Sequence, residues 1–95
     1  MTAYWMARVN LTDADVYGEY AKLAGPAIEK HGGRFLARGG ESVTLEGEDF
    51  GCNVVIQFDS VEQAVAAYNS PEYKEALEFS SKSSIRNVCI VDGVD

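Results

Sequence analysis

The sequence predicts an α+β domain of the ferredoxin-like type, in which a four-stranded antiparallel sheet carries helices on one of its faces. The first observation is the order of periodicities, which runs strand, helix, strand, strand, helix, strand. The second is that two consecutive split βαβ units with right-handed crossovers leave few other topologies. The third is the length of 95 residues, which suits one hydrophobic core, so a single domain is expected over residues 1–95.

The first strand is expected over residues 3–11, where small or apolar residues occupy every second position. The residues that share its buried face are Ala3, Trp5, Ala7, Val9 and Leu11. Thr12 then offers an N-cap oxygen for a helix over about residues 13–31. Gly32 and Gly33 are expected to end this helix.

The second strand is expected over residues 34–38, and the third over residues 52–58. Between them, Gly39 and Gly40 indicate a bulge or a sharp bend, because glycine has no steric cost at positive φ. The second strand is expected to resume at residues 43–46, ahead of a polar turn.

Two capping patterns predict the helical part of the second half. Ser60 with Gln63 resembles a capping box at the start of one helix. Ser70 followed by Pro71 predicts a second helical segment, with the serine as N-cap and proline at the first helical position. This segment is expected to run to about Ser81, before a short final strand at residues 88–91.

The face of the sheet opposite the helices is expected to be partly apolar. Simple alternation places on it Tyr4, Met6 and Arg8 from the first strand and Arg34, Leu36 and Arg38 from the second. An open sheet face of this composition needs a cover, and in so short a chain the available cover is a second copy. The sequence therefore predicts a homodimer, a dimeric α+β barrel whose interior is partly polar.

Charge and composition limit the partners. Fifteen acidic residues against eight basic ones give a formal net charge of -7, which disfavours nucleic acid and anionic membranes. A local basic spot is still compatible with one small anion. Residues 1–10 lack the pattern of a signal peptide, and no apolar run approaches the roughly 20 residues of a membrane helix. The expected location is cytoplasmic.

No pattern for a metal, a cofactor or a nucleophile is recognised. The chain has one histidine, His31, which is expected to interact with the carbonyl end of the first helix. Tyrosines with arginine and glutamate form a better candidate: Tyr17, Tyr20, Tyr68, Tyr73, Arg38 and Glu46. Arginine can clamp an anionic or enolisable molecule while tyrosine donates hydrogen bonds or protons. The alternative interpretation is that the tyrosines are core rings and that Arg38 pairs with Glu46.

Six segments of the chain resemble the domain of unknown function 1330 family. They are Ala3-Tyr4-Trp5, Tyr17 through Tyr20, Gly32-Gly33-Arg34-Phe35-Leu36, Arg38-Gly39-Gly40, Leu45-Glu46-Gly47 and Ser70-Pro71-Glu72-Tyr73. The resemblance covers nearly the whole chain and implies the dimeric α+β barrel superfamily. Relatives in that superfamily include small monooxygenases, isomerases, and dehalogenating or haem-handling proteins, beside members with no known activity.

The family motifs carry over to specific residues of this chain. The matching positions are Tyr17, Tyr20, Arg38, Gly39, Glu46, Tyr68, Ser70 and Tyr73. One departure is Ser80, since many family members carry arginine at about that position, while this chain has Lys82 close by. If that arginine binds an anion in relatives, this chain is expected to bind it less well or differently.

Two functions are compatible with these residues. The first is a cofactor-independent isomerase, cyclase or monooxygenase acting on a small anionic or enolisable molecule, with Arg38 holding the anionic oxygen and Tyr68 or Tyr20 relaying a proton. Tyr17, Glu46, Ser70 and Tyr73 would bind the ligand. The second is a non-catalytic dimer that binds or senses a small metabolite in the same pocket. Arg38→Ala should abolish turnover, with little change in melting temperature, only if the first holds.

Overall fold

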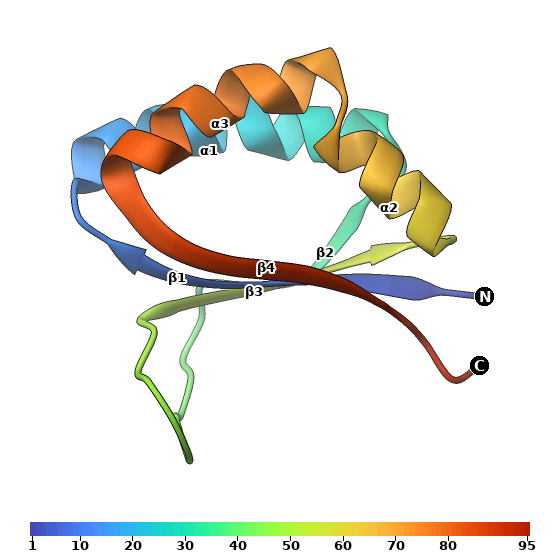
Figure 1. Cartoon of the computed structure of the whole chain (residues 1–95), viewed down its shortest axis with the longest axis horizontal. Coiled ribbons are helices and arrows are strands. Elements are labelled where there is room, and N and C mark those ends of the chain that lie inside the picture. The colour runs from blue at the N-terminus through green and yellow to red at the C-terminus, as the bar shows by residue number, and fades with distance from the viewer.

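The computed structural model describes residues 1–95. The elements are β1 (Ala3–Leu11), α1 (Ala14–Lys30), β2 (Arg34–Arg38), β3 (Cys52–Phe58), α2 (Val61–Tyr68), α3 (Pro71–Ser83) and β4 (Ser84–Asp92). The four strands form one antiparallel sheet in the order β2-β3-β1-β4, and all three helices lie over one of its faces (Figure 1). The predicted ferredoxin-like fold is confirmed.

β1 lies in the middle of the sheet and supplies the floor of the core. Its inward residues Ala3, Trp5, Ala7 and Val9 are all at most 5% exposed. Leu11, expected on the same buried face, is 47% exposed. The reason is that β3 pairs with β1 only as far as Val9, so the end of β1 has a neighbour on one side alone.

The first helix begins one residue later than predicted. Asp13 is the N-cap, and its carboxylate accepts a hydrogen bond from the Val16 amide at 3.2 Å. The Thr12 prediction is wrong because this residue still follows the strand. Its backbone N–H donates to the Ser83 carbonyl at 2.8 Å.

A β-bulge in β2 changes which residues face the helices. Phe35 pairs with Ile56, but the register shifts before Ala37, which pairs with Val55. Leu36 is the additional residue, so Arg38 lies on the helix side of the sheet. Alternation had placed Arg38 on the open face, which is wrong. Of the two alternatives predicted for Gly39–Gly40, the structure has the bend, at Gly39, and the bulge lies three residues earlier, at Leu36.

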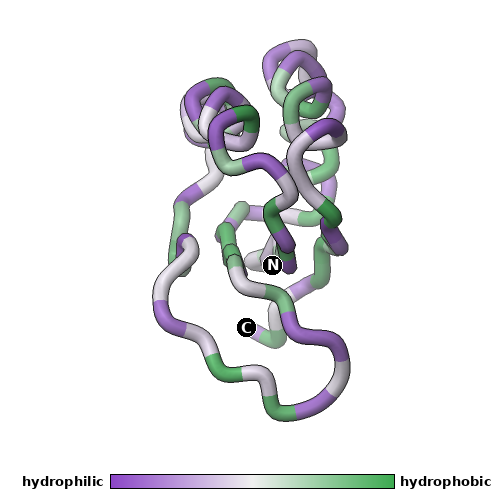
Figure 2. Tube along the Cα trace, turned by 90° about the vertical axis from the view of Figure 1, so that its left-hand side faces the viewer, coloured by the Kyte–Doolittle hydropathy of each residue, from purple (hydrophilic) through white to green (hydrophobic).

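The chain leaves the sheet at Gly39, where φ is +71°. The predicted strand at residues 43–46 is absent, since Val43 is 74% and Leu45 87% exposed and no strand lies beside them. Residues 39–51 form instead a loop that extends on the side of the sheet opposite the helices (Figures 1 and 2). Arg8 and Asn10 of the open face hold the loop by hydrogen bonds to the Glu48 and Asp49 carbonyls.

Serine caps begin both α2 and α3. The Ser60 hydroxyl accepts from the Gln63 amide at 3.0 Å, and the Ser70 hydroxyl accepts from the Tyr73 amide at 3.2 Å. α3 ends at Ser83 and β4 follows directly, so the last strand is longer than the four residues predicted. Its ladder to β1 runs from Ser84 to Asp92, because backbone pairing does not require apolar side chains.

The open face of the sheet carries several apolar side chains. Met6, Leu36, Ile85 and Val91 are all exposed. No helix of the chain is both long and apolar enough to cross a membrane.

Candidate functional site

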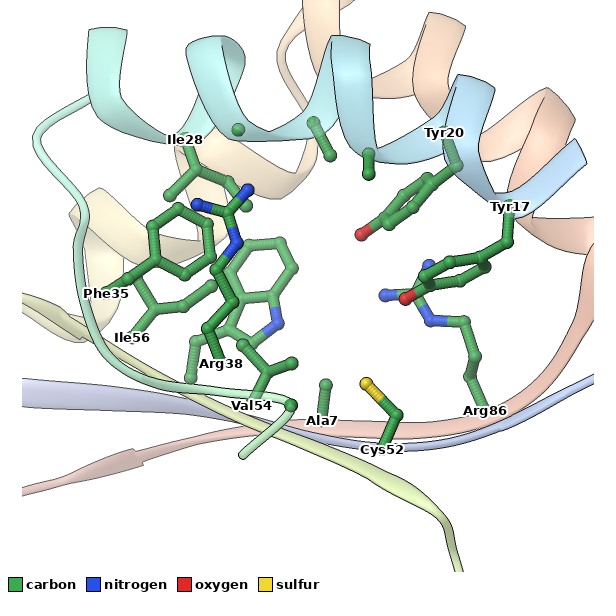
Figure 3. Close-up of a pocket in the computed structure, with 15 residues that line it drawn as sticks. Ala7, Tyr17, Tyr20, Ile28, Phe35, Arg38, Cys52, Val54, Ile56 and Arg86 are labelled. Atoms are coloured by element: carbon green, nitrogen blue, oxygen red, sulfur yellow. The ribbon is translucent and has the colours of Figure 1, made fainter. Parts of the chain in front are cut away.

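A cavity of about 100 Å³ lies between α1 and the sheet. Most of its lining residues are apolar, among them Trp5, and Phe35, Ile56 and Val54 lie together on one side (Figure 3). The polar side chains that line it are few: two tyrosines, two arginines and Cys52. A concave, mainly apolar pocket with a few convergent polar groups is the usual form of a small-molecule site.

Small residues make the cavity. Ala21, Ala24 and Gly25 line its roof on α1, and Ala7 of β1 lies in its floor. Ala24 and Gly25 follow Ala21 by three and four positions along the helix, so the three residues of α1 lie on the same face and point toward the sheet. Where a helix and a sheet pack through such short side chains, the space between them remains unfilled.

A hydrogen-bonded cluster of Arg86, Tyr73 and Tyr20 forms one wall. The Arg86 Nη2 donates to the Tyr73 hydroxyl oxygen at 2.9 Å, and the hydroxyls of Tyr73 and Tyr20 are 2.7 Å apart. The Arg86 guanidinium carbon also lies 4.9 Å from the centre of the Tyr20 ring. The three residues come from β4, α3 and α1, so this cluster ties three elements together.

The hydroxyls of Tyr17 and Tyr20 and the guanidinium of Arg86 point into the cavity (Figure 3). The two tyrosine rings lie 4.9 Å apart, one helical turn from each other on α1. Burial raises the pKa of both Tyr17 and Tyr20 above the ordinary value. Both are therefore protonated at neutral pH and act as hydrogen-bond donors rather than as bases.

Arg86 remains a cation. Burial by itself would lower the pKa of its guanidinium, but the adjacent phenols of Tyr20 and Tyr73 outweigh this and raise the pKa. The Arg86 Nε is buried and has no hydrogen-bond partner. A buried N–H without a partner is rare and costs stability.

Arg38 forms the opposite wall. Its guanidinium carbon lies 4.0 Å from the centre of the Phe35 ring, and it makes no ion pair. A Cβ added at Gly25 would lie 3.0 Å from the Arg38 Nη2, so the glycine leaves room for this side chain against α1. A glycine inside a helix lowers the stability of the helix by about 1 kcal/mol relative to alanine. The close approach of Arg38 explains why a glycine is nevertheless found at position 25.

The predicted site residues fall into two groups. Tyr17, Tyr20 and Arg38 line the cavity together. Tyr73 is fully buried behind them and reaches the site through its hydroxyl.

The other predicted residues lie elsewhere. Tyr68 does not line the cavity; its ring packs against Trp5 at 5.6 Å and below the Lys74 ammonium at 5.3 Å. Ser70 is a buried helix cap. Glu46 is exposed in the loop after β2, and no ion pair joins it to Arg38.

Arg86 is the site residue that the sequence interpretation missed. The final strand was predicted too short, so Arg86 fell outside it. The available signal was the pattern Arg86-x-Val88-x-Ile90, because all three residues pair with inward positions of β1. This signal was weak, because arginine side chains are usually exposed and are not expected on the buried face of a strand.

Ser80, where the family resemblance implies arginine, is buried near the end of α3. Its hydroxyl donates to the Leu77 carbonyl at 3.2 Å, and it lies beside Arg86 along a second, more open hollow. The guanidinium that lies along this hollow is that of Arg86, on β4.

The single histidine joins two helices, and the two cysteines lie on opposite faces of the sheet. The His31 Nε2 lies 2.9 Å from the Glu72 carboxylate, which also contacts the Lys30 ammonium at 3.2 Å, so His31 ties α1 to α3. Cys52 and Cys89 are free thiols; Cys52 lines the cavity, and Cys89 lies on the open face of the sheet.

The fold and the cavity define a small ferredoxin-like α+β protein with an apolar pocket between helix and sheet. The sequence matches the family described as "Domain of unknown function (DUF1330)" over residues 2–94, and the chain belongs to this family. No curated protein matches it significantly.

Solved structures share the fold at low sequence identity. A protein of unknown function from Rhodopseudomonas palustris, RPA0582, is 19% identical with a TM-score of 0.82, over 99% of this chain and 83% of that one. SnoaB, a cofactor-independent oxygenase from Streptomyces nogalater, is 9% identical with a TM-score of 0.68, over 99% and 94%. A dimeric ferredoxin-like protein of unknown function from Thermobifida fusca is 17% identical with a TM-score of 0.57, over 96% and 90%.

Proposed function

We propose that the chain binds a small enolisable anion in the cavity under α1 and is a cofactor-independent enzyme of the monooxygenase, isomerase or cyclase type. The observation that carries this proposal is the pair of guanidiniums and two protonated tyrosine hydroxyls in a cavity that no acidic side chain lines. Fixed donors in an apolar site stabilise charge that develops on a substrate oxygen.

In the proposed complex, the substrate oxygen accepts hydrogen bonds from Arg86 and from the Tyr20 or Tyr17 hydroxyl. Tyr73 holds Arg86 in place through the 2.9 Å hydrogen bond and contributes its own proton to the Tyr20 oxygen, which leaves the Tyr20 proton for the substrate. These donors lower the free energy of the enolate relative to the keto form of the bound anion. The proton lost on enolate formation goes to water, because no carboxylate or imidazole lines the cavity. The enolate is then reprotonated at another atom in an isomerase, or reacts with dioxygen in a monooxygenase.

A homodimer is part of the proposal. The exposed apolar residues of the open sheet face support it, and related structures include proteins described as dimeric. Packing two open faces together would remove these side chains from water and leave the cavity under α1 accessible on each protomer.

A non-catalytic metabolite-binding dimer is the second candidate. The specific observation in its favour is that no aspartate, glutamate or histidine lines the cavity, so the chain supplies no evident general base. Saturable binding with no product after prolonged incubation would select this function.

The test begins with native mass spectrometry of the freshly purified protein, which reports assembly and any co-purified ligand together. The proposal expects a dimer, with a small extra mass that Arg86→Gln removes. A bare monomer overturns the dimer. Turnover of a candidate substrate that Arg86→Gln leaves unchanged would remove the proposed chemistry, even if the protein remains dimeric.

A further inference from the structure

The cavity contains two positive charges and nothing on the chain that neutralises them. Arg86 makes its only hydrogen bond to a neutral phenol, and Arg38 makes none. All ion pairs of the chain involve other cations, namely Lys22, Lys30 and His31. In a chain of net charge -7, two unpaired guanidiniums in one cavity are not a consequence of composition.

The sheet register places these two charges far apart. Arg38 is on β2 and Arg86 is on β4, the two edges of the sheet, with β3 and β1 between them. Three inter-strand spacings of about 4.8 Å separate the two strands by roughly 14 Å. Arg38 is level with Val54 and Ala7, whereas Arg86 is level with Val9, two residues or roughly 7 Å further along.

Both side chains lie over the helix-facing side of the sheet, from opposite walls of the cavity (Figure 3). The span between the two guanidiniums is therefore shorter than the backbone separation, and apolar side chains line it: Phe35, Ile56 and Val54 beside Arg38, with Ala7 below. A ligand that fits has an apolar centre. It meets one guanidinium at each end.

We infer that the ligand is a dianion: a small molecule with an anionic oxygen group at each end of an apolar body. This inference rests on the proposed function and names the substrate class of the same cavity. Guanidinium forms its strongest contacts with carboxylate-like groups, in bidentate geometry, and each contact gains from the apolar surroundings. A monoanion would neutralise only one of the two charges.

Arg38 is then the residue that distinguishes a dianion from a monoanion. It is exposed at the edge of the cavity and stacks on Phe35, so its removal does not disturb the core. Arg86 accepts the first anionic group in either case. The two arginines therefore have separable effects on affinity.

The test uses isothermal titration calorimetry with two probes of matched shape, terephthalate and 4-methylbenzoate. The unmodified protein is expected to bind terephthalate at least tenfold more tightly. Arg38→Gln should abolish this preference, because it should weaken terephthalate binding much more than 4-methylbenzoate binding. Arg34→Gln is the control, because it removes the same charge from the same strand on the open face.

Affinities for the two probes within threefold of each other would overturn the inference, as would equal effects of Arg34→Gln and Arg38→Gln. Failure of both probes to bind overturns it as well. A different result tests the proposed function. If 4-methylbenzoate binds and Arg86→Gln abolishes this binding, the anion site stands whether or not the dianion is preferred.

Discussion

The interior has two halves, one toward α2 and α3 and one under α1, and they differ in the size of the side chains between helix and sheet. Toward α2 and α3, large rings fill the space: Trp5 lies 6.1 Å from Phe58 and 5.1 Å from Tyr73. Under α1, alanine and glycine face the sheet and a cavity remains. The space of the cavity therefore comes from the small side chains of one helix face, while the bulge in β2 brings Arg38 to its wall.

Trp5 lies at the boundary between these halves. It packs against the rings on one side and lines the cavity on the other. The filled half thus acts as a rigid support for the hollow one. Substitutions in the two halves are expected to separate stability from binding.

The largest effect is expected in the filled half. Phe58→Ala removes a ring that is 1% exposed and stacked on Trp5, so it should lower the free energy of unfolding by about 3–5 kcal/mol. Urea denaturation measures this change, and Phe58→Leu should lose less because it retains most of the volume. A loss below about 1 kcal/mol for the alanine variant would contradict the tight packing of this half.

Tyr73→Phe affects the contact between the halves. It leaves the Tyr20 hydroxyl and the Arg86 Nη2 without their partner and should cost about 1–3 kcal/mol of unfolding free energy. Binding of 4-methylbenzoate should also weaken, because Arg86 loses the bond that orients it. Tyr68→Phe is the matched control, since its hydroxyl makes no hydrogen bond, and its stability should stay near that of the unmodified protein.

A substitution that fills the hollow half should change binding more than stability. Ala24→Leu places a larger side chain in the cavity, so 4-methylbenzoate binding should be lost while the unfolding free energy changes by about 1 kcal/mol or less. The same substitution at Ala27, on the same helix but outside the cavity, should instead destabilise by about 1–3 kcal/mol through overpacking. Equal destabilisation at both positions would mean that no usable space exists beside Ala24.

The smallest effect is expected on the surface between α1 and α3. The hydrogen bond from His31 and the contact with Lys30 lower the pKa of Glu72 from 4.5 to about 2. A carboxyl whose pKa is lowered by folding stabilises the folded state at every pH above its pKa in the unfolded chain. This contribution disappears as the pH falls from 4.5 toward 2. Glu72→Gln should therefore lower the melting temperature by about 2 °C or less at neutral pH.

A thermal melt series from pH 7 to pH 2 measures this dependence. The difference between Glu72→Gln and the unmodified protein should shrink to nothing at the acid end. A difference that stays constant across the series would show that the carboxylate charge is not its source.

The fold and part of the cavity could be predicted from local patterns. The alternation of Ala3 to Val9 identified the inward face of β1, and the serine caps at Ser60 and Ser70 located the starts of α2 and α3. Tyr17 and Tyr20 were placed on one helix by their spacing alone. These predictions succeed because each depends on residues within a few positions of one another.

Three features depended on the tertiary structure. The side of the sheet on which Arg38 lies is decided by the bulge at Leu36, which is visible only in the pairing with β3. The inward position of Arg86 depends on the long ladder between β4 and β1. The hydrogen bonds of Tyr73 to Tyr20 and Arg86 join residues 53 and 13 positions apart.

Short stretches of the chain specify the order of the elements, the inward face of β1, the helix caps and the family motifs. The tertiary structure decided which polar side chains share the cavity and which predicted ones, Glu46 and Tyr68 among them, lie outside it. The physical reason is that strand register and helix packing set these distances. A shift of one residue in pairing moves a side chain to the other face of the sheet.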